Sequence, residues 1–173
     1  MTNPVYTFGH STRPIEEFIH LLKLHQIETV VDVRSIPKSR HNPQFNEDAL
    51  RTSLAASGLA YQHFEGLGGL RHTTHASVNT AWRNASFRGY ADYMQTPAFT
   101  ENLEKLMALA AQTQVVIMCA EAVPWRCHRS LIGDALIIRG ITVEDIISEH
   151  SCTPHTLTPF AKVDGLVITY PAG

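Results

Sequence analysis

The feature of this sequence that most constrains its fold is a regular alternation of strand-like and helix-like segments. Short apolar runs predict five strands, at 5–9, 28–35, 60–64, 114–120 and 142–149. Amphipathic segments between them predict helices, at 14–25, 46–57, 98–112 and 128–139. Such alternation is typical of a parallel sheet. We therefore expect an open, mostly parallel five-stranded α/β sheet of Rossmann-like type, with helices on both faces.

Two segments do not follow the alternation. Residues 66–97 form a long insertion rich in Gly, His, Asn and Thr, in which residues 87–94 have the apolar spacing of a short helix. Long insertions in compact domains are often functional. The tail, 151–173, is rich in Thr and Pro, and its residues 165–171 are a candidate edge strand. We expect a single α/β domain over 1–173, with its core at about 5–150.

The length and composition favour a soluble protein that needs no covalent staple. A chain of 173 residues can bury most of its apolar surface without metal or disulfides. The N-terminus lacks the pattern of a secretory signal, and no apolar run approaches the ~20 residues that cross a bilayer. We expect a cytoplasmic location and no membrane partner. The three cysteines, Cys119, Cys127 and Cys152, are then expected to be free thiols.

Basic residues are concentrated although the formal net charge is −2. That balance gives no reason to expect general attraction to nucleic acid. Seven of the 14 lysines and arginines nevertheless fall in three short stretches, namely Arg34, Lys38 and Arg40; Arg83 and Arg88; Arg126 and Arg129. If the fold brings them together, they form a local anion site. We expect Arg83, Asn84 and Arg88, which belong to the insertion, to present hydrogen-bond donors over the mouth of this pocket.

Reactive side chains end four of the predicted strands. His10 follows the first strand, Arg34 ends the second, Glu65 follows the third, and Cys119 and Glu121 lie at the end of the fourth. Ligands of open parallel sheets bind beyond the carboxyl ends of the strands. We therefore expect His10, Arg34, Glu65 and Cys119 to surround one pocket.

The segment MCAEAVPWRCHRSLI, residues 118–132, reads as a crossover from a strand to a helix that begins near His128. The positive end of that helix, together with Arg126 and Arg129, would attract an anion and lower the pKa of a nearby thiol. Cys127 is flanked by these groups, whereas Cys119 continues an apolar run, where burial raises the pKa of a thiol. We therefore expect Cys127 to be the more reactive thiol, with His128 favouring its thiolate or moving protons.

Five sequence blocks together closely resemble the domain of unknown function 488 family: TFGHSTR (7–13), VVDVRSIPKSRHNPQF (30–45), HFEGLGG (63–69), WRNASFRGYADYM (82–94) and MCAEAVPWRCHRSLI (118–132). The resemblance covers residues 5 to about 150. It implies an α/β domain whose characteristic blocks lie at the predicted strand ends. It implies no particular reaction.

A weaker resemblance connects the chain to the rhodanese and cysteine-phosphatase families. In both, a cysteine at the end of a strand precedes an anion-binding loop with an arginine, and VVDVRS is similar to a rhodanese strand. This resemblance implies a nucleophilic role for Cys119 and an anion-binding role for Arg126. Six residues separate the two here, where phosphatases have five, and Pro124 and Trp125 stand where glycines would expose backbone N–H groups.

The leading hypothesis is an enzyme that binds a small phosphate- or sulfur-bearing anion with a cysteine thiolate and an arginine-lined pocket. One alternative is a zinc or iron protein that uses Cys119, Cys127 and His128, with His10 or Glu121 as a further ligand. The residues indicate no specific cofactor.

A third hypothesis is a non-catalytic nucleic-acid-binding module. Aromatic and cationic side chains alternate in the insertion, as they do in proteins that bind single strands, at Trp82, Arg83, Phe87, Arg88 and Tyr90.

Overall fold

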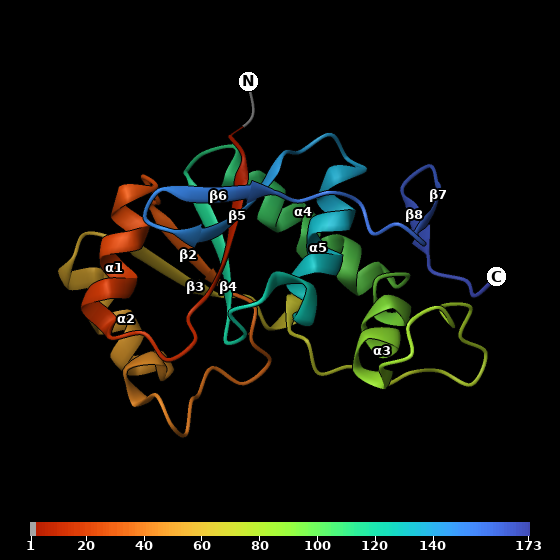
Figure 1. The fold of residues 1–173 in the computed structure, drawn as a ribbon, viewed down its shortest axis with the longest axis horizontal. Coiled ribbons are helices and arrows are strands. Elements are labelled where there is room, and N and C mark those ends of the chain that lie inside the picture. The colour runs from red at the N-terminus through yellow and green to blue at the C-terminus, as the bar shows by residue number, and fades with distance from the viewer. Residues whose placement is uncertain (1–2) are drawn as a thin grey trace.

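The computed structural model describes residues 3–173, and within them six strands form one mixed sheet (Figure 1). In spatial order the strands are β3 (Ala60–His63), β2 (Thr29–Asp32), β4 (Val115–Cys119), β1 (Val5–Gly9), β5 (Val143–Ser148) and β6 (Ser151–Pro154). The first five pair in parallel, and β6 pairs with β5 in the antiparallel sense. The predicted open, mostly parallel α/β fold is confirmed.

Helices lie where the sequence predicts them. They are α1 (Ile15–Leu24), α2 (Glu47–Ala56), α3 (Ala85–Tyr93), α4 (Pro97–Ala110) and α5 (Arg129–Ile137). Short 3-10 turns join them to the strands, at η1 (Pro43–Phe45), η2 (Glu65–Leu67) and η3 (Pro124–Arg126). Gly58 and Gly140, which follow α2 and α5, have the left-handed φ angles of +79° and +81° expected of residues that end helices. None of the helices within residues 3–173 combines the length and apolar character needed to cross a membrane.

The C-terminal tail differs from the sequence expectation. The sequence did not predict β6, which follows β5 after a turn at Glu149 and His150 and extends the sheet at its edge. Residues 165–171 do not form an edge strand of this sheet. They contribute β8 (Val167–Thr169), which pairs with β7 (Lys162–Asp164) in a separate hairpin. An exposed edge strand needs no apolar pattern of its own, so the sequence gives little sign of it.

The sheet is covered on both faces, and the central strand β4 shows how. Val116 and Met118 pack with the apolar residues of α1 and α2, whereas Val115, Ile117 and Cys119 pack with those of α3, α4 and α5. Alternate residues of a strand point to opposite faces, so every residue of β4 is buried. This burial explains why β4 is continuously apolar.

The connections of β2 and β4 create a crevice at the carboxyl edge of the sheet. These strands are neighbours, yet β2 leads to α2 on one face while β4 leads to α5 on the other. The two loops therefore diverge, which is the arrangement that forms ligand sites in parallel sheets. Strand β1 ends at this edge with Gly9, which lies directly against the loop after β4. Only glycine fits there, because a Cβ on Gly9 would overlap the backbone carbonyl of Glu121.

Substituting Gly9→Ala should lower the free energy of unfolding by about 3 kcal/mol, because the loop after β4 must shift to admit the methyl group. Gly140→Ala is the matched control. A Cβ there meets no atom within 4 Å, so only the left-handed φ opposes it, at a cost of about 1 kcal/mol. Chemical denaturation of the two variants measures the difference. If both variants lost the same free energy of unfolding, the close approach of β1 to the loop after β4 would be contradicted.

Candidate functional site

A cleft of about 380 Å³ opens at the carboxyl ends of β2 and β4. The loops after these two strands form most of it, and Gly69, Leu70, Ser86 and Phe87 of the insertion complete its wall. Seven of the residues expected at a site line it: Arg34, Lys38, Cys119, Glu121, Arg126, Cys127 and His128. The divergent loops thus bring together the two cysteines and three of the basic side chains.

The central feature of the site is a contact between Arg129 and Cys119. Arg129 begins α5, is only 1% exposed, and directs its guanidinium back towards the end of β4. Its Nη1 donates to Cys119 Sγ at 2.8 Å and to the carbonyl of Glu121, and Nη2 donates to the carbonyl of Ala122 at 3.1 Å. A buried guanidinium needs an anionic partner. The Cys119 sulfur is the group in direct contact that can supply that charge.

Cys127 and Arg129 together lower the pKa of the Cys119 thiol. Burial alone would raise the pKa of Cys119, but hydrogen bonding from the Cys127 thiol and the charge and hydrogen bond of Arg129 outweigh burial and lower that pKa to about 7. Burial raises the pKa of Cys127, and the neighbouring Cys119 thiolate raises it further. Ionisation of Cys119 is therefore favoured over that of Cys127, the reverse of the order expected from the sequence. The reactivity expected of Cys127 stays a prediction.

The groups that flank Cys127 in the sequence do not lie where they could lower the pKa of its thiol. Arg126 is exposed, and Arg129 reaches past Cys127, contacting its sulfur only through the backbone N–H at 3.5 Å. His128 is neutral, because burial lowers its pKa to about 4. Its Nε2 donates to the carbonyl of Val33 at 2.8 Å, so Nδ1, which lies 3.6 Å from Cys127 Sγ, is an acceptor.

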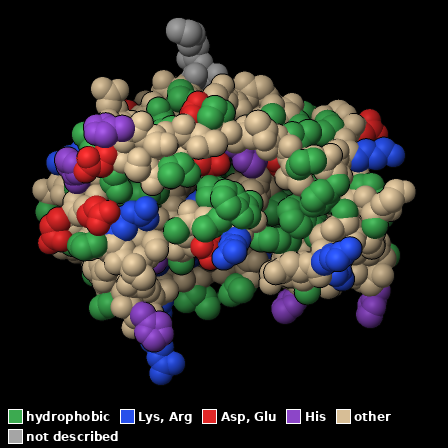
Figure 2. Space-filling model, in the orientation of Figure 1, with side chains coloured by type: hydrophobic (Ala, Val, Ile, Leu, Met, Phe, Trp, Pro, Cys, Tyr) green, Lys and Arg blue, Asp and Glu red, His purple; other side chains and the backbone are tan. Residues whose placement is uncertain are grey.

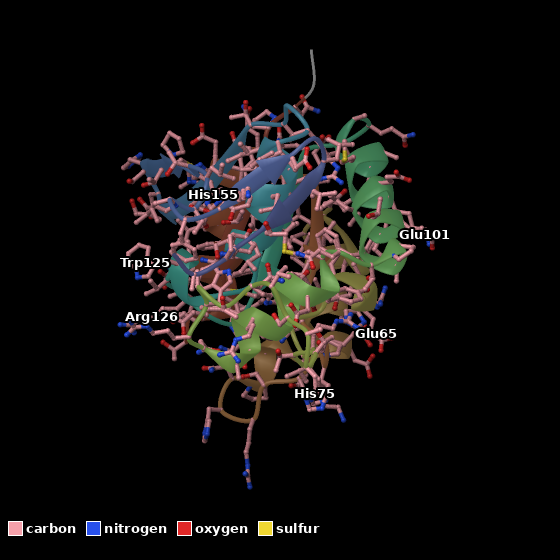
Figure 3. The ribbon with its side chains drawn as sticks, turned by 90° about the vertical axis from the view of Figure 1, so that its right-hand side faces the viewer. Glu65, His75, Glu101, Trp125, Arg126 and His155 are labelled. Carbon is pink, nitrogen blue, oxygen red and sulfur yellow. The ribbon has the colours of Figure 1, made fainter. Side chains whose placement is uncertain are left out.

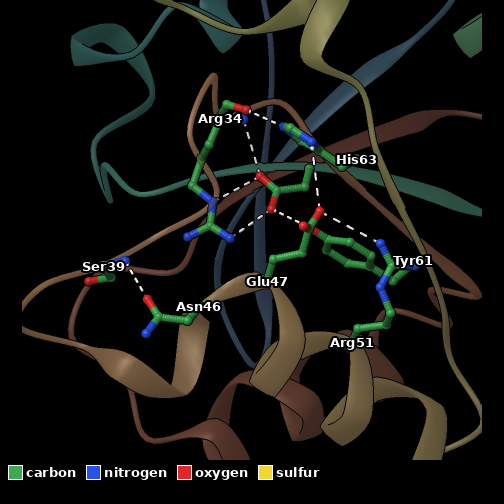
Figure 4. A network of polar contacts seen from close by, with 8 residues as sticks. Arg34, Ser39, Asn46, Glu47, Arg51, Tyr61 and His63 are labelled. Carbon is green, nitrogen blue, oxygen red and sulfur yellow. Dashed lines mark hydrogen bonds and ion pairs between the residues drawn. The ribbon is translucent and has the colours of Figure 1, made fainter.

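A second buried arginine, Arg34, lines the same cleft and is held rigidly (Figure 4). Its Nε and Nη2 donate to the two carboxylate oxygens of Asp32 at 2.9 and 2.7 Å, and Tyr61 donates to the same carboxylate at 2.6 Å. The remaining nitrogen, Nη1, is buried and has no hydrogen-bond partner among the described residues. Arg34 thus has one nitrogen whose hydrogen-bonding capacity is unused by the described residues.

His10 and Glu65 were expected to line the pocket, but neither lines the cleft. His10 lies at the same sheet edge and donates its backbone N–H to the carbonyl of Cys119, but its ring is buried and stacks on Phe45 at 4.1 Å. Burial lowers the pKa of His10 to about 4. Glu65 instead lines another cleft beside α4, far from Arg126 (Figure 3). The η2 turn begins at Glu65 and directs it away.

Four other expected residues also lie outside the cleft. Arg40 and Arg83 are exposed and do not line it. Asn84 caps α3, because its side-chain oxygen accepts from the N–H groups of Ser86 and Phe87. Arg88 donates to the backbone carbonyls of Trp82 and Arg83. Local backbone groups therefore occupy the side chains of Asn84 and Arg88, which were expected to be donors for a ligand.

The metal-centre alternative gains no support from this geometry. Across residues 3–173, no set of three or more His, Cys, Asp or Glu side chains is placed to hold one metal ion. Cys119, Cys127 and His128 line the same cleft, but His128 Nε2 is occupied by the carbonyl of Val33.

Sequence reasoning missed the role of Tyr61 and the contribution of α3. Tyr61 of β3 reaches Asp32 across the β2–β3 pair, and Ser86 and Phe87 line the cleft. The first contact depends on strand register, which no local pattern reveals. The apolar spacing of α3 predicted its helix but not which of its side chains would face a ligand.

The fold and the site together define an α/β protein with a buried cysteine–arginine pair in a crevice at the carboxyl edge of a mostly parallel sheet. A family model described as "Domain of unknown function DUF488" matches residues 14–136, which is more than half of the chain. The chain therefore belongs to this family. Searches of curated proteins and of solved structures find no match. The likeness to rhodaneses and cysteine phosphatases stays a prediction.

Titration of thiolate absorbance should show one ionisation with a midpoint near the pKa of about 7 that the surroundings of Cys119 produce. Cys119→Ser should remove it. Arg129→Lys should keep the midpoint low by retaining the positive charge, whereas Cys127→Ala should raise it because a hydrogen bond to the thiolate is lost. Cys152→Ser is the control and should leave the midpoint unchanged. A midpoint that disappears with Cys127→Ser instead would assign the thiolate to the other cysteine.

Proposed function

We propose that this protein is an enzyme in which the Cys119 thiolate attacks a small substrate carrying a phosphate- or sulfur-based anionic group. One observation carries the proposal: the sulfur of Cys119 lies 2.8 Å from a buried guanidinium and lines a cleft with Arg34, Lys38 and Arg126. A thiolate present near neutral pH is the form of cysteine that acts as a nucleophile.

The charges around the cleft favour an anionic group beside this sulfur. Arg34 keeps Nη1 without a partner among the described residues, and Lys38 and Arg126 are exposed. The carboxylate of Glu121 also lines the cleft, but it accepts from the backbone N–H of Val123 at 3.2 Å. Three cations thus surround the cleft of a chain whose formal net charge is −2.

Side chains, and not a backbone cradle, would hold the anion. In the loop after β4, the carbonyls of Glu121 and Ala122 turn inward to accept from Arg129. Inward-facing carbonyls repel an anion, so this part of the loop does not provide a ring of converging N–H groups. This difference from a phosphate-binding loop favours recognition by Arg34, Lys38 and Arg126.

Two reactions fit a thiolate in this setting. With a thiosulfate group, the Cys119 thiolate attacks the outer sulfur, the S–S bond of the substrate breaks, and sulfite leaves with the electron pair, so that Cys119 becomes a persulfide. With a phosphate ester, the thiolate attacks phosphorus, the P–O bond breaks, and the alkoxide leaves and takes a proton from water, so that Cys119 becomes phosphorylated. The two reactions share the nucleophile and the anion contacts.

The nucleic-acid alternative is less well supported. The ring of Trp82 packs edge-to-face against Phe87, Phe160 and Tyr170, and Arg88 is engaged with backbone carbonyls. The alternating aromatic and cationic residues of the insertion therefore do not form an open row of stacking platforms.

Sulfate and phosphate should slow the alkylation of Cys119 by iodoacetamide, measured by peptide mass spectrometry. Removing the exposed cations in Lys38→Ala or Arg126→Ala should weaken this protection about threefold to tenfold, since one hydrogen bond to a charged group is lost. Arg83→Ala is the matched control, because Arg83 is exposed but does not line the cleft. Protection that is equal in all four proteins would contradict anion binding in this cleft.

Incubation with thiosulfate or p-nitrophenyl phosphate then distinguishes the two reactions. A persulfide on Cys119 with release of sulfite supports sulfur transfer, and a phosphate on Cys119 supports phosphoryl transfer. Cys119→Ser should abolish the modification, whereas Cys152→Ser should not. If anions protect Cys119 from alkylation but neither a persulfide nor a phosphate forms on it, the protein binds anions without reacting with them. That result would overturn the enzymatic proposal.

A further inference from the structure

A further cavity, of about 430 Å³, lies between the start of α5, strands β5 and β6, and the tail that follows β6. Figure 2 shows hydrophobic side chains gathered around a hollow in the middle of this face. The η3 turn separates this cavity from the cysteine cleft, because Trp125 lines the cavity and Arg126 lines the cleft. Both side chains project from the same edge of the molecule (Figure 3).

Three aromatic rings, those of Trp82, Trp125 and Phe160, line the cavity. Trp82 and Phe160 meet edge-to-face at 4.9 Å, so their relative orientation is fixed. Trp125 is nevertheless 71% exposed and Phe160 is 42% exposed. Large rings left open at the mouth of a cavity are typical of a surface that a ligand covers, and their faces favour a planar partner.

The polar lining of the cavity consists of the carboxylate of Asp145, the ring of His155, the hydroxyls of Ser130 and three threonines, and the N–H of Trp82, which has no hydrogen-bond partner among the described residues. Asp145 is only 7% exposed, and one of its oxygens accepts from the hydroxyl of Thr7. Its other oxygen, Oδ2, makes no hydrogen bond within residues 3–173 and lies 3.9 Å from Nδ1 of His155. His155 Nε2 lies 2.9 Å from a carboxylate oxygen of Asp134, so in the tautomer that donates to Asp134, Nδ1 is also an acceptor. The carboxylate of Asp145 is thus the acceptor that does not depend on the state of His155.

The charge of this cavity is opposite to that of the cysteine cleft. Among the described residues that line it there is no lysine or arginine, and Asp145 is a carboxylate. An anionic group is disfavoured there, whereas a ring with N–H donors meets the complementary carboxylate of Asp145. Stacking between aromatic side chains and hydrogen bonding along one edge is a common way to bind a nucleobase.

We infer that this cavity binds a planar nitrogen heterocycle with N–H donors on one edge, of the nucleobase class, between its aromatic rings and the carboxylate of Asp145. The inference goes beyond the proposed reaction and does not depend on Cys119. Trp125 and Phe160 supply the stacking surface, and Asp145 supplies the acceptor that selects for N–H groups.

The two tryptophans of the chain both line this cavity, so tryptophan fluorescence reports on it. Titration with guanosine, an uncharged nucleoside with N–H donors, should quench that fluorescence saturably. Caffeine, a planar heterocycle without N–H donors, should bind at least tenfold more weakly. Equal affinities would overturn the assignment of the acceptor, and no saturable quenching by guanosine or adenosine would overturn the site.

Variants measured by calorimetry complete the test. Trp125→Ala should weaken guanosine binding about tenfold, because one stacking surface is lost. Asp145→Asn should reduce the preference for guanosine over caffeine, and a thermal melt shows whether that variant is folded. Leu166→Ala, which removes another exposed apolar side chain, is the matched control. Cys119→Ser should bind guanosine unchanged, which separates this site from the proposed reaction. Unaltered binding by Trp125→Ala would refute the inference.

Discussion

The contact between Arg129 and Cys119 is the interaction on which the site depends. A guanidinium that is 1% exposed is stable only where its charge and its donors are satisfied. Two carbonyls of the loop after β4 and the sulfur of Cys119 satisfy most of them. The same contact therefore fixes the shape of the loop, the start of α5 and the ionisation of the thiol. Removing Arg129 would alter all three together.

The second arginine of the cleft is held by a separate arrangement. Asp32 is fully buried at the end of β2, where it binds Arg34 through both carboxylate oxygens. The hydroxyl of Tyr61 adds a further donor to the same carboxylate. This network fixes the orientation of Arg34, so little conformational entropy would be lost if the proposed anion bound to it. Lys38 and Arg126, which are exposed, have no comparable restraint.

Sequence patterns predicted the fold well because it depends on periodicity. The continuous apolar run of β4 and the alternation of strands and helices follow from burial on both faces of a parallel sheet. From them the carboxyl edge, and with it Arg34 and Cys119, could be located. The pattern could not show which thiol ionises, because the guanidinium of Arg129 contacts a cysteine ten residues away and not its near neighbour Cys127. Nor could it show that Asn84 and Arg88 bind their own backbone.

The buried cysteine–arginine pair also links the stability of the fold to pH. The pKa of Cys119 is lowered from its ordinary value of 9.0 to about 7 in the folded protein. The pair therefore stabilises the folded state fully above pH 9, and this contribution is lost as the pH falls towards 7. Cys127 acts in the opposite sense, because its raised pKa disfavours the folded state once unfolded thiols ionise above pH 9. Proton linkage from these two sulfurs thus favours the native structure most on the mildly alkaline side of neutrality.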